Sequence, residues 1–161
     1  MAPLNIHWQH ARYRAMIGTG GIGTGIFFAL NGNHTLGREE SRSGRLLDRR
    51  DYCKLHIISH YVKVLLGENF PTILLGKVGE DAAGHSLLEE MHQTGLDTRY
   101  VQLIPGEHTM LSIVFTYPDS SGGNLTAENS ACDQVDEAFI LKAAPEFPLW
   151  RGKGIALSAP E

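Results

Sequence analysis

Residues 73–101 constrain the fold more than any other part of this 161-residue sequence. They begin with a short apolar run, 73–75, of the kind found in buried strands. Asp81 then precedes a segment in which apolar residues recur at one-turn spacing, and Gly95 follows it, which predicts a helix with an aspartate N-cap and a left-handed glycine C-cap. Polar Asp97 begins a second strand. We therefore predict a strand–loop–helix–strand unit, as in α/β proteins.

This unit resembles one in the ribokinase-like, or PfkB, carbohydrate and nucleoside kinases. That family carries Gly-x-Val-Gly-x-Asp-x-x-Gly, then Leu-x-x-x-Met, then Gly-Val-Asp and a strand. We assign Gly79, Asp81 and Gly84 to loop geometry rather than to chemistry. The residues that match the motif are Gly76, Val78, Gly79, Asp81, Gly84, Leu87, Met91, Gly95, Leu96 and Asp97.

The resemblance extends beyond this unit and covers most of residues 15–140. Residues 109–117 look like the family's next strand, 118–124 like its hairpin turn and 129–131 like its Gly-Ala-Asn-type segment. It implies a ribokinase-like three-layer α/β/α sandwich, which is Rossmann-like, with a small β lid. The lid candidates are residues 32–54 and the hairpin at 120–124.

Two domain regions are expected. Residues 1–14 form an irregular N-terminal lead, and residues 15–161 form the substrate-binding part of a kinase domain that is truncated at its C-terminus. Within the second region, a glycine-rich strand at 15–25 continues as a second apolar piece at 26–30. A short helix at 135–144 and the opening of a strand at 154–157 follow near the end.

A helix is predicted from Tyr52 to Leu66. Its apolar residues Leu55, Ile58, Val62 and Leu65 fall on one face, and Gly67 follows as a stop.

Composition favours a globular chain able to bury a core, with 42% hydrophobic and 20% charged residues. A net charge of -4 provides no basic field, so we expect no nucleic acid partner. Because the N-terminus lacks an apolar signal core and residues 26–30 are too short to cross a bilayer, we expect a cytoplasmic protein with no membrane partner. Cys53 and Cys132 are too few for a disulfide framework and are read as reduced thiols.

The glycine cluster at residues 18–23 also satisfies Gly-x-Gly-x-x-Gly, which keeps a Rossmann-type dinucleotide-binding module as an alternative. That site would need a helix directly after Gly23. The competing interpretation is that these glycines allow the first strand to kink or to approach its neighbours closely.

The sequence departs from the family where substrate is normally bound. Thr24 and Gly25 stand where the family has an aspartate that contacts sugar hydroxyls, and the Gly-Gly pair and asparagine at the helix start are replaced by a basic run that includes Arg49 and Lys54. Cations at a helix N-terminus favour an anionic group, so a sugar acid or sugar phosphate is one candidate substrate. The alternative is a solvated charge run balanced by nearby acids. By position, the candidate substrate-binding residues are Gly25, Arg42, Arg49, Lys54 and Asn129.

Cys53, His56 and His60 fall on one helical stripe, at a spacing that could chelate zinc. A fourth ligand is not evident, and such residues more often pack in a helix face, so we predict no metal site.

No catalytic residue is predicted in this chain. The family places its catalytic aspartate, in a Gly-x-Gly-Asp segment, and its nucleotide pocket in the C-terminal half, and no such pattern follows Gly123. ATP and Mg²⁺ are implied for the full-length family, but we expect neither to be bound tightly here and expect the isolated chain to be inactive. A non-catalytic ligand-binding or interaction remnant is the third alternative. The expected partners are a small-molecule sugar, sugar acid or sugar phosphate and a second copy of the chain, bound through the lid or an exposed sheet edge.

Overall fold

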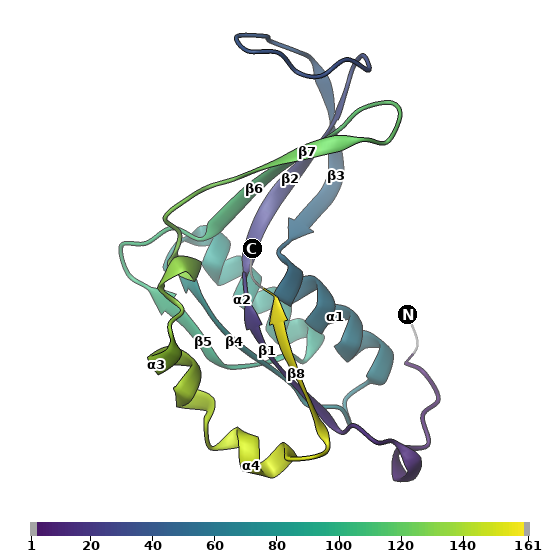
Figure 1. Cartoon of the computed structure of the whole chain (residues 1–161), viewed down its shortest axis with the longest axis vertical. Helices are drawn as coiled ribbons and strands as arrows, with labels where there is room; N and C mark the ends of the chain where they lie inside the picture. The colour runs from purple at the N-terminus through teal and green to yellow at the C-terminus, as the bar shows by residue number, and fades with distance from the viewer. Residues whose placement is uncertain (1–2, 160–161) are drawn as a thin grey trace.

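A computed structural model of the chain describes residues 3–159, apart from the side chains of residues 48–51. It consists of two four-stranded sheets with helices around one of them (Figure 1). The core sheet has the strand order β5-β4-β1-β8, and the lid sheet, which projects from it, has the order β3-β2-β6-β7. The elements in chain order are η1 (Trp8–His10), β1 (Ala15–Gly20), β2 (Gly23–Leu30), β3 (Gly44–Tyr52), α1 (Lys54–Leu66), β4 (Thr72–Gly79), α2 (Ala82–Thr94), β5 (Asp97–Ile104), β6 (Met110–Thr116), β7 (Gly122–Thr126), η2 (Ala131–Gln134), α3 (Glu137–Ile140), η3 (Leu141–Ala143), α4 (Glu146–Trp150) and β8 (Gly154–Ala159).

The core sheet is parallel and separates two helical layers. β1 pairs with β4 on one side and with β8 on the other, and β4 pairs with β5. Because side chains alternate along a strand, β4 sends Leu74 and Val78 to one face and Ile73 and Leu75 to the other. The first face is covered by α1 and α2, and the second by the segment from η2 to α4 (Figure 1). The predicted three-layer α/β/α arrangement with a β lid is confirmed.

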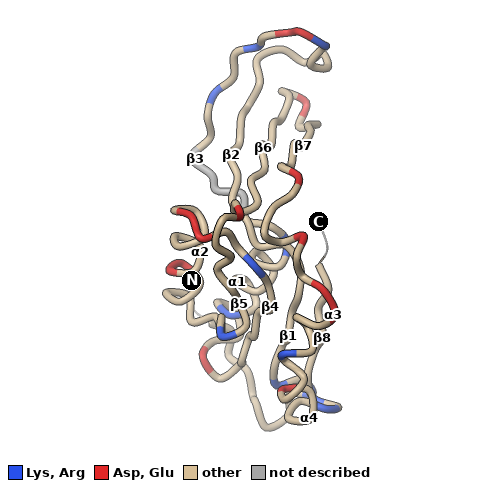
Figure 2. Tube along the Cα trace, turned by 90° about the vertical axis from the view of Figure 1, so that its left-hand side faces the viewer, with Lys and Arg blue, Asp and Glu red and all other residues tan. Residues whose placement is uncertain are grey.

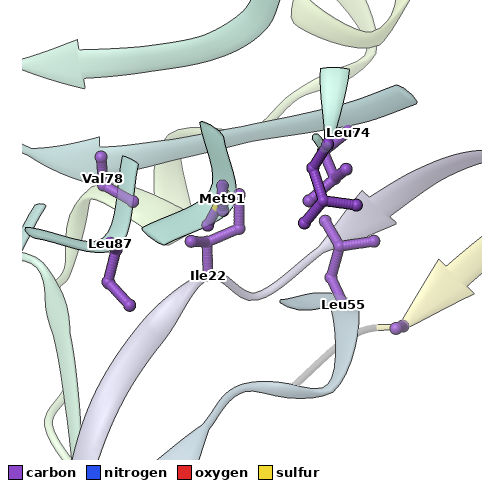
Figure 3. Close-up of a cluster of buried hydrophobic side chains, with 8 residues drawn as sticks. Ile22, Leu55, Leu74, Val78, Leu87 and Met91 are labelled. Atoms are coloured by element: carbon purple, nitrogen blue, oxygen red, sulfur yellow. The ribbon is translucent and has the colours of Figure 1, made fainter. Parts of the chain in front are cut away.

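The main core lies between the sheet and helices α1 and α2 (Figure 3). Leu55 of α1, Met91 of α2 and Ile22 of the β1–β2 connection are each fully buried there. Ile22 lies where a side chain on residue 76 would point, because a Cβ on Gly76 would come 2.5 Å from the Ile22 Cδ1 atom. The apolar run 73–75 suggests a strand that ends at Gly76. In the structure β4 includes Gly76 and continues to Gly79.

The lid sheet is entered directly from β1. Gly20 has a φ of 150°, and a Cβ at this position would collide with the Ala159 carbonyl, so only glycine fits where the chain leaves the core sheet. β2 then pairs with β3 and β6, and β6 pairs with β7. This confirms that the glycine-rich strand continues as a second apolar strand, although in a different sheet.

The predicted caps of α2 are confirmed. The Asp81 side chain accepts a hydrogen bond from the Gly84 backbone N–H at 2.8 Å, and Gly95 ends the helix with a φ of 80°. The helix expected at residues 52–66 begins two residues later, at Lys54, and ends at Leu66 as predicted, with Gly67 as its C-cap.

The prediction of which face of α1 is buried is wrong. Leu55 is buried, but Ile58 is 37% exposed, while His56, Ser59 and Lys63 are buried instead. Apolar spacing could not show this because α1 packs against both the sheet and α2, which turns its polar residues inward.

The remaining segments follow the expected outline. Residues 3–14 contain only η1 as regular structure, and the lead contacts the domain where Trp8 stacks on Phe70 with ring centroids 5.9 Å apart. The helix expected at 135–144 is divided into α3 and η3. β8 lies at the edge of the core sheet and exposes Ile155, Ala156 and Ser158.

Candidate functional site

A cavity of about 310 Å³ lies where the carboxyl end of the core sheet meets the base of the lid. In open α/β sheets, ligands bind outside the carboxyl ends of the strands, at the point where the chain changes direction. In this sheet the strands that follow β1 in the chain, β4 and β5, lie on one side of it, and β8 lies on the other. The strand order therefore reverses between the neighbouring strands β1 and β8. The residues lining the cavity are Thr19, Gly20, Gly21, Met110, Cys132, Asp133, Val135, Ile140 and Ser158.

Thr19 gives this cavity its most informative polar group. Its hydroxyl oxygen is buried and has no hydrogen-bond partner among the described residues. Ser158 is opposite Thr19 in the β1–β8 pairing, so its side chain lies on the same face of the sheet. A buried hydroxyl without a partner costs roughly 1–3 kcal/mol, so a ligand hydroxyl that bonded to it would gain affinity.

Segment η2 forms the side wall of the cavity, and the contacts of Cys132 fix its position. The Cys132 thiol lies 3.2 Å from the carbonyl oxygen of Ile22 and 3.3 Å from that of Lys77. The Asp133 carboxylate accepts a hydrogen bond from the Ser130 backbone N–H at 2.9 Å, which completes a capping box. This wall therefore carries one carboxylate and one reduced thiol.

A second cavity, of about 330 Å³, lies on the other side of the lid base, against α2. Lid residues Thr24, Gly25 and Leu46 form one wall, and Ser86 and Glu90 of α2 form the other.

The five predicted substrate-binding residues come from different elements and loops. Gly25 is buried and lines the second cavity. Lys54 is exposed at the first position of α1, and Asn129 is exposed with a φ of 58°. Arg49 belongs to β3, but its side chain is outside the described residues.

Arg42 makes its contacts within the tip of the lid. Its guanidinium donates hydrogen bonds to Glu40 and to the His34 carbonyl at 2.6 Å, and it lies 5.9 Å from the centre of the Tyr117 ring. These contacts close the loop at the tip of the lid. The pKa of Glu40 is lowered to about 2 by the backbone N–H of Gly37 and by Arg42.

Sequence reasoning missed Thr19, Cys132 and Ser158. A polar residue at the end of a buried parallel strand is the signal that would have found Thr19. No comparable signal exists for Cys132 because only the tertiary fold brings η2 next to β1.

The dinucleotide alternative is contradicted by the fold. Strand β2 begins at Gly23, in the place where a pyrophosphate-binding site needs a helix N-terminus.

The zinc alternative for Cys53, His56 and His60 finds no support. Within residues 3–159, leaving out the side chains of 48–51, no three His, Cys, Asp or Glu residues are grouped so that they could bind a metal ion. The His56 ring packs on Tyr52 at a centroid distance of 4.4 Å, and burial lowers the pKa of His56 to about 4.

Comparison with protein families identifies the chain. A model of the pfkB family carbohydrate kinases matches residues 59–144, which is more than half of the sequence. The chain belongs to this family. No curated protein matches it by sequence.

Solved structures of pfkB-type kinases share the fold. The ribokinase of Giardia lamblia superposes with a TM-score of 0.70 at 12% identity, covering 94% of this chain and 43% of that protein. The ribokinase of Cryptococcus neoformans, in complex with ADP, gives a TM-score of 0.57 at 18% identity, covering 71% and 34%. The nucleoside kinase of Burkholderia thailandensis, in complex with inosine, gives 0.57 at 18%, covering 70% and 36%. The chain thus spans less than half the length of each of these kinases.

Among the described residues, none of the helices is both long and apolar enough to pass through a bilayer.

Proposed function

We propose that this pfkB chain forms the acceptor-binding part of an ATP-dependent kinase that phosphorylates a hydroxyl of a sugar or related small molecule. The observation that supports this most is the buried Thr19 hydroxyl, which lacks a protein partner within the described region and lies at a cavity under the lid. A polyol hydroxyl has both a donor and an acceptor to offer such a group. Gly20 and Gly21 keep the cavity wall free of side chains.

In this proposal the residues of the chain bind and orient the acceptor. Thr19 and Ser158 bond to substrate hydroxyls, and the lid excludes water from the cleft. ATP, when bound, supplies the phosphoryl group. We expect the 161-residue chain alone to show no ATP-dependent phosphorylation, since transfer requires donor and acceptor to be placed together.

The lining of the cavity favours a neutral substrate. Asp133 is its charged residue, and no cation lines it among the described side chains. A carboxylate near the ligand repels anionic groups. A sugar acid or phosphate stays the alternative because Lys54 is exposed at the start of α1 and the basic side chains before it are outside the described residues.

The proposal is tested by ligand-induced shifts in melting temperature. Neutral pentoses, hexoses and nucleosides should stabilise the chain more than sugar phosphates or sugar acids do. Thr19→Val keeps the shape of the side chain but removes the hydroxyl, so neutral sugars should bind roughly fivefold more weakly, the usual effect of one lost hydrogen bond.

Thr126→Val, at an exposed lid position, serves as the control and should bind as the unmodified chain does. Equal binding by the Thr19→Val and Thr126→Val variants, or no stabilisation by any sugar, would contradict the proposed site. A cytoplasmic location and the absence of nucleic acid and membrane partners stay predictions.

We also propose that a second copy binds one face of the lid sheet. The strand register places Ile26, Ile113 and Leu125 side by side on this face. Phe28, two residues after Ile26 in β2, lies on the same face and pairs with Leu46 of β3 and Phe115 of β6. Leu46 is 61% exposed and Leu125 is 63% exposed. Strands β2 and β6 carry no charged residue, whereas strand β3 and the loop at the tip of the lid do (Figure 2).

An exposed apolar face of this kind marks an interaction surface. Because its described members carry no charge, it requires an equally apolar partner surface. The same face of a second copy supplies one, and pairing a patch with itself about a two-fold axis is the commonest arrangement in homodimers.

A further inference from the structure

The lid is bonded to helix α2 at the base of strand β6. Thr109, which directly precedes β6, is buried and donates two hydrogen bonds to the Asp81 carboxylate. Its backbone N–H lies 2.8 Å from Asp81 Oδ2, and its hydroxyl lies 2.7 Å from Asp81 Oδ1. Since Asp81 is also the N-cap of α2, the start of the helix and the base of β6 share one carboxylate. We call this contact the β6 clamp.

A second contact joins α2 to the end of strand β3. The hydroxyl of Tyr52, the last residue of β3, donates a hydrogen bond to Glu90 Oε2 at 2.6 Å. The hydroxyl of Ser86, one turn earlier in α2, lies 3.3 Å from the other oxygen of the same carboxylate. A short bond from a hydroxyl to a carboxylate is among the stronger kinds in proteins. We call this contact the β3 clamp.

The two clamps act at separate points of the same helix. Asp81 and Glu90 are nine residues apart, which is about 14 Å along an α-helix. Strands β3 and β6 lie on either side of β2 in the lid sheet. Two attachments at this spacing restrain rotation of the lid as well as its displacement, whereas one attachment would leave a pivot.

Between the clamps the lid does not pack tightly on α2. The cavity of about 330 Å³ occupies this space, with Tyr52 and Glu90 in its lining. The β3 clamp borders this opening on one side, while the Tyr52 ring also packs on His56 and against the main core.

We propose that helix α2 sets the position of the lid over the cleft through these two clamps, with Glu90 and Tyr52 as positioning residues. Only the statement that the lid covers a substrate-binding cleft rests on the proposed function; the two clamps do not depend on it. With the β3 clamp broken, the β3 side of the lid is held less firmly than the β6 side, which keeps its own clamp.

Hydrogen exchange measured by mass spectrometry on the full chain tests this without any ligand. Tyr52→Phe removes the hydroxyl and keeps the ring. Amides of β2 and β3 should then exchange roughly tenfold faster, the effect of losing a bond to a charged group, whereas amides of β4 in the core sheet should keep their rates. Glu90→Gln should act in the same direction, and the effects of the two changes should be less than additive in the double variant, because both weaken the same Tyr52–Glu90 bond.

Gln93→Ala is the matched control, since Gln93 is exposed on the same helix and bonds to Glu89 rather than to the lid. Unchanged lid exchange in Tyr52→Phe would overturn the inference, as would an equal acceleration of β4, which indicates general destabilisation. If Glu90→Gln does not fold, the conservative Tyr52→Phe variant decides the question alone. Faster lid exchange in a chain that binds no sugar would leave the clamps established and the proposed function rejected.

Discussion

His56 shows how a single buried residue links this fold to pH. Its side chain is buried against Tyr52, and it lies near His60 of the same helix and near Glu90 of α2. Burial first, and then the neighbouring His60, lowers the pKa of His56 to about 4 from its usual 6.5, while Glu90 opposes the change. The folded chain therefore holds this imidazole neutral.

Stability should fall as the pH drops from 6.5 toward 4. In this window the unfolded chain binds a proton at residue 56 and the folded chain does not, so unfolding becomes more favourable by up to about 3 kcal/mol. His56→Phe keeps an aromatic ring next to Tyr52 and removes the titration. Urea denaturation at a series of pH values should show a flatter profile for this variant than for His85→Gln, an exposed control. Parallel profiles for the two would contradict the assignment.

The family motif in the β4–α2 loop is explained by close backbone approach. A Cβ on Gly84 would collide with the Gly79 carbonyl, and one on Gly79 would come 2.5 Å from the Thr109 backbone nitrogen. The prediction that these glycines and Asp81 serve loop geometry agrees with these contacts. What the sequence could not show is that the same loop anchors the lid, because Thr109 is 28 residues away from Asp81.

Among the elements, α4 is attached to the core sheet by one buried carboxylate. Glu146 is 6% exposed and accepts hydrogen bonds from Arg99 at 3.1 Å and from Tyr100 at 3.2 Å, both in β5. Arg99 is bonded to Asp97 as well, which fixes its guanidinium. Burial and the bond to Glu146 raise the pKa of Tyr100.

Glu146→Ala should release the η2–α4 segment from the sheet. It leaves the Tyr100 hydroxyl and the Arg99 guanidinium without this partner, which is expected to cost roughly 2 kcal/mol of stability. Limited proteolysis should cut within residues 137–153 faster than in the unmodified chain. Glu137→Ala, at an exposed position on α3, should be cut at the unmodified rate, and equal rates for both variants would argue against the anchoring role.

Helix α1 shows where element-level prediction from sequence fails. Its start, its stop and its helical character were predictable because Gly67 and the apolar spacing are local signals. Its buried face was not, since His56 and Lys63 are buried by contacts with α2 that no local pattern records. The long stem of Lys63 packs inward while its ammonium reaches the Glu68 carbonyl at 3.5 Å.

For the molecule as a whole, the exposed lid face predicts self-association. Leu125→Lys places a charge on the apolar face and should shift the chain from dimer to monomer, because an unpaired charge is costly to bury. Analytical ultracentrifugation over a range of concentrations measures this. Leu141→Lys changes an equally exposed leucine, 54% accessible, on η3 outside the lid, and should leave the dimer intact. A monomer in the unmodified chain would remove the proposed interface.

The sequence by itself determined the α/β class, the β4–α2–β5 unit with its caps and the family, because strand and helix periods, cap residues and glycine contacts are local properties. It did not determine the site. The cavity is formed by the end of β1, the end of β8, the base of β6 and η2, which are up to about 140 residues apart in the chain. Only tertiary packing brings Thr19, Cys132 and Ser158 together, and it places Arg42, chosen by its position in the sequence, at the tip of the lid.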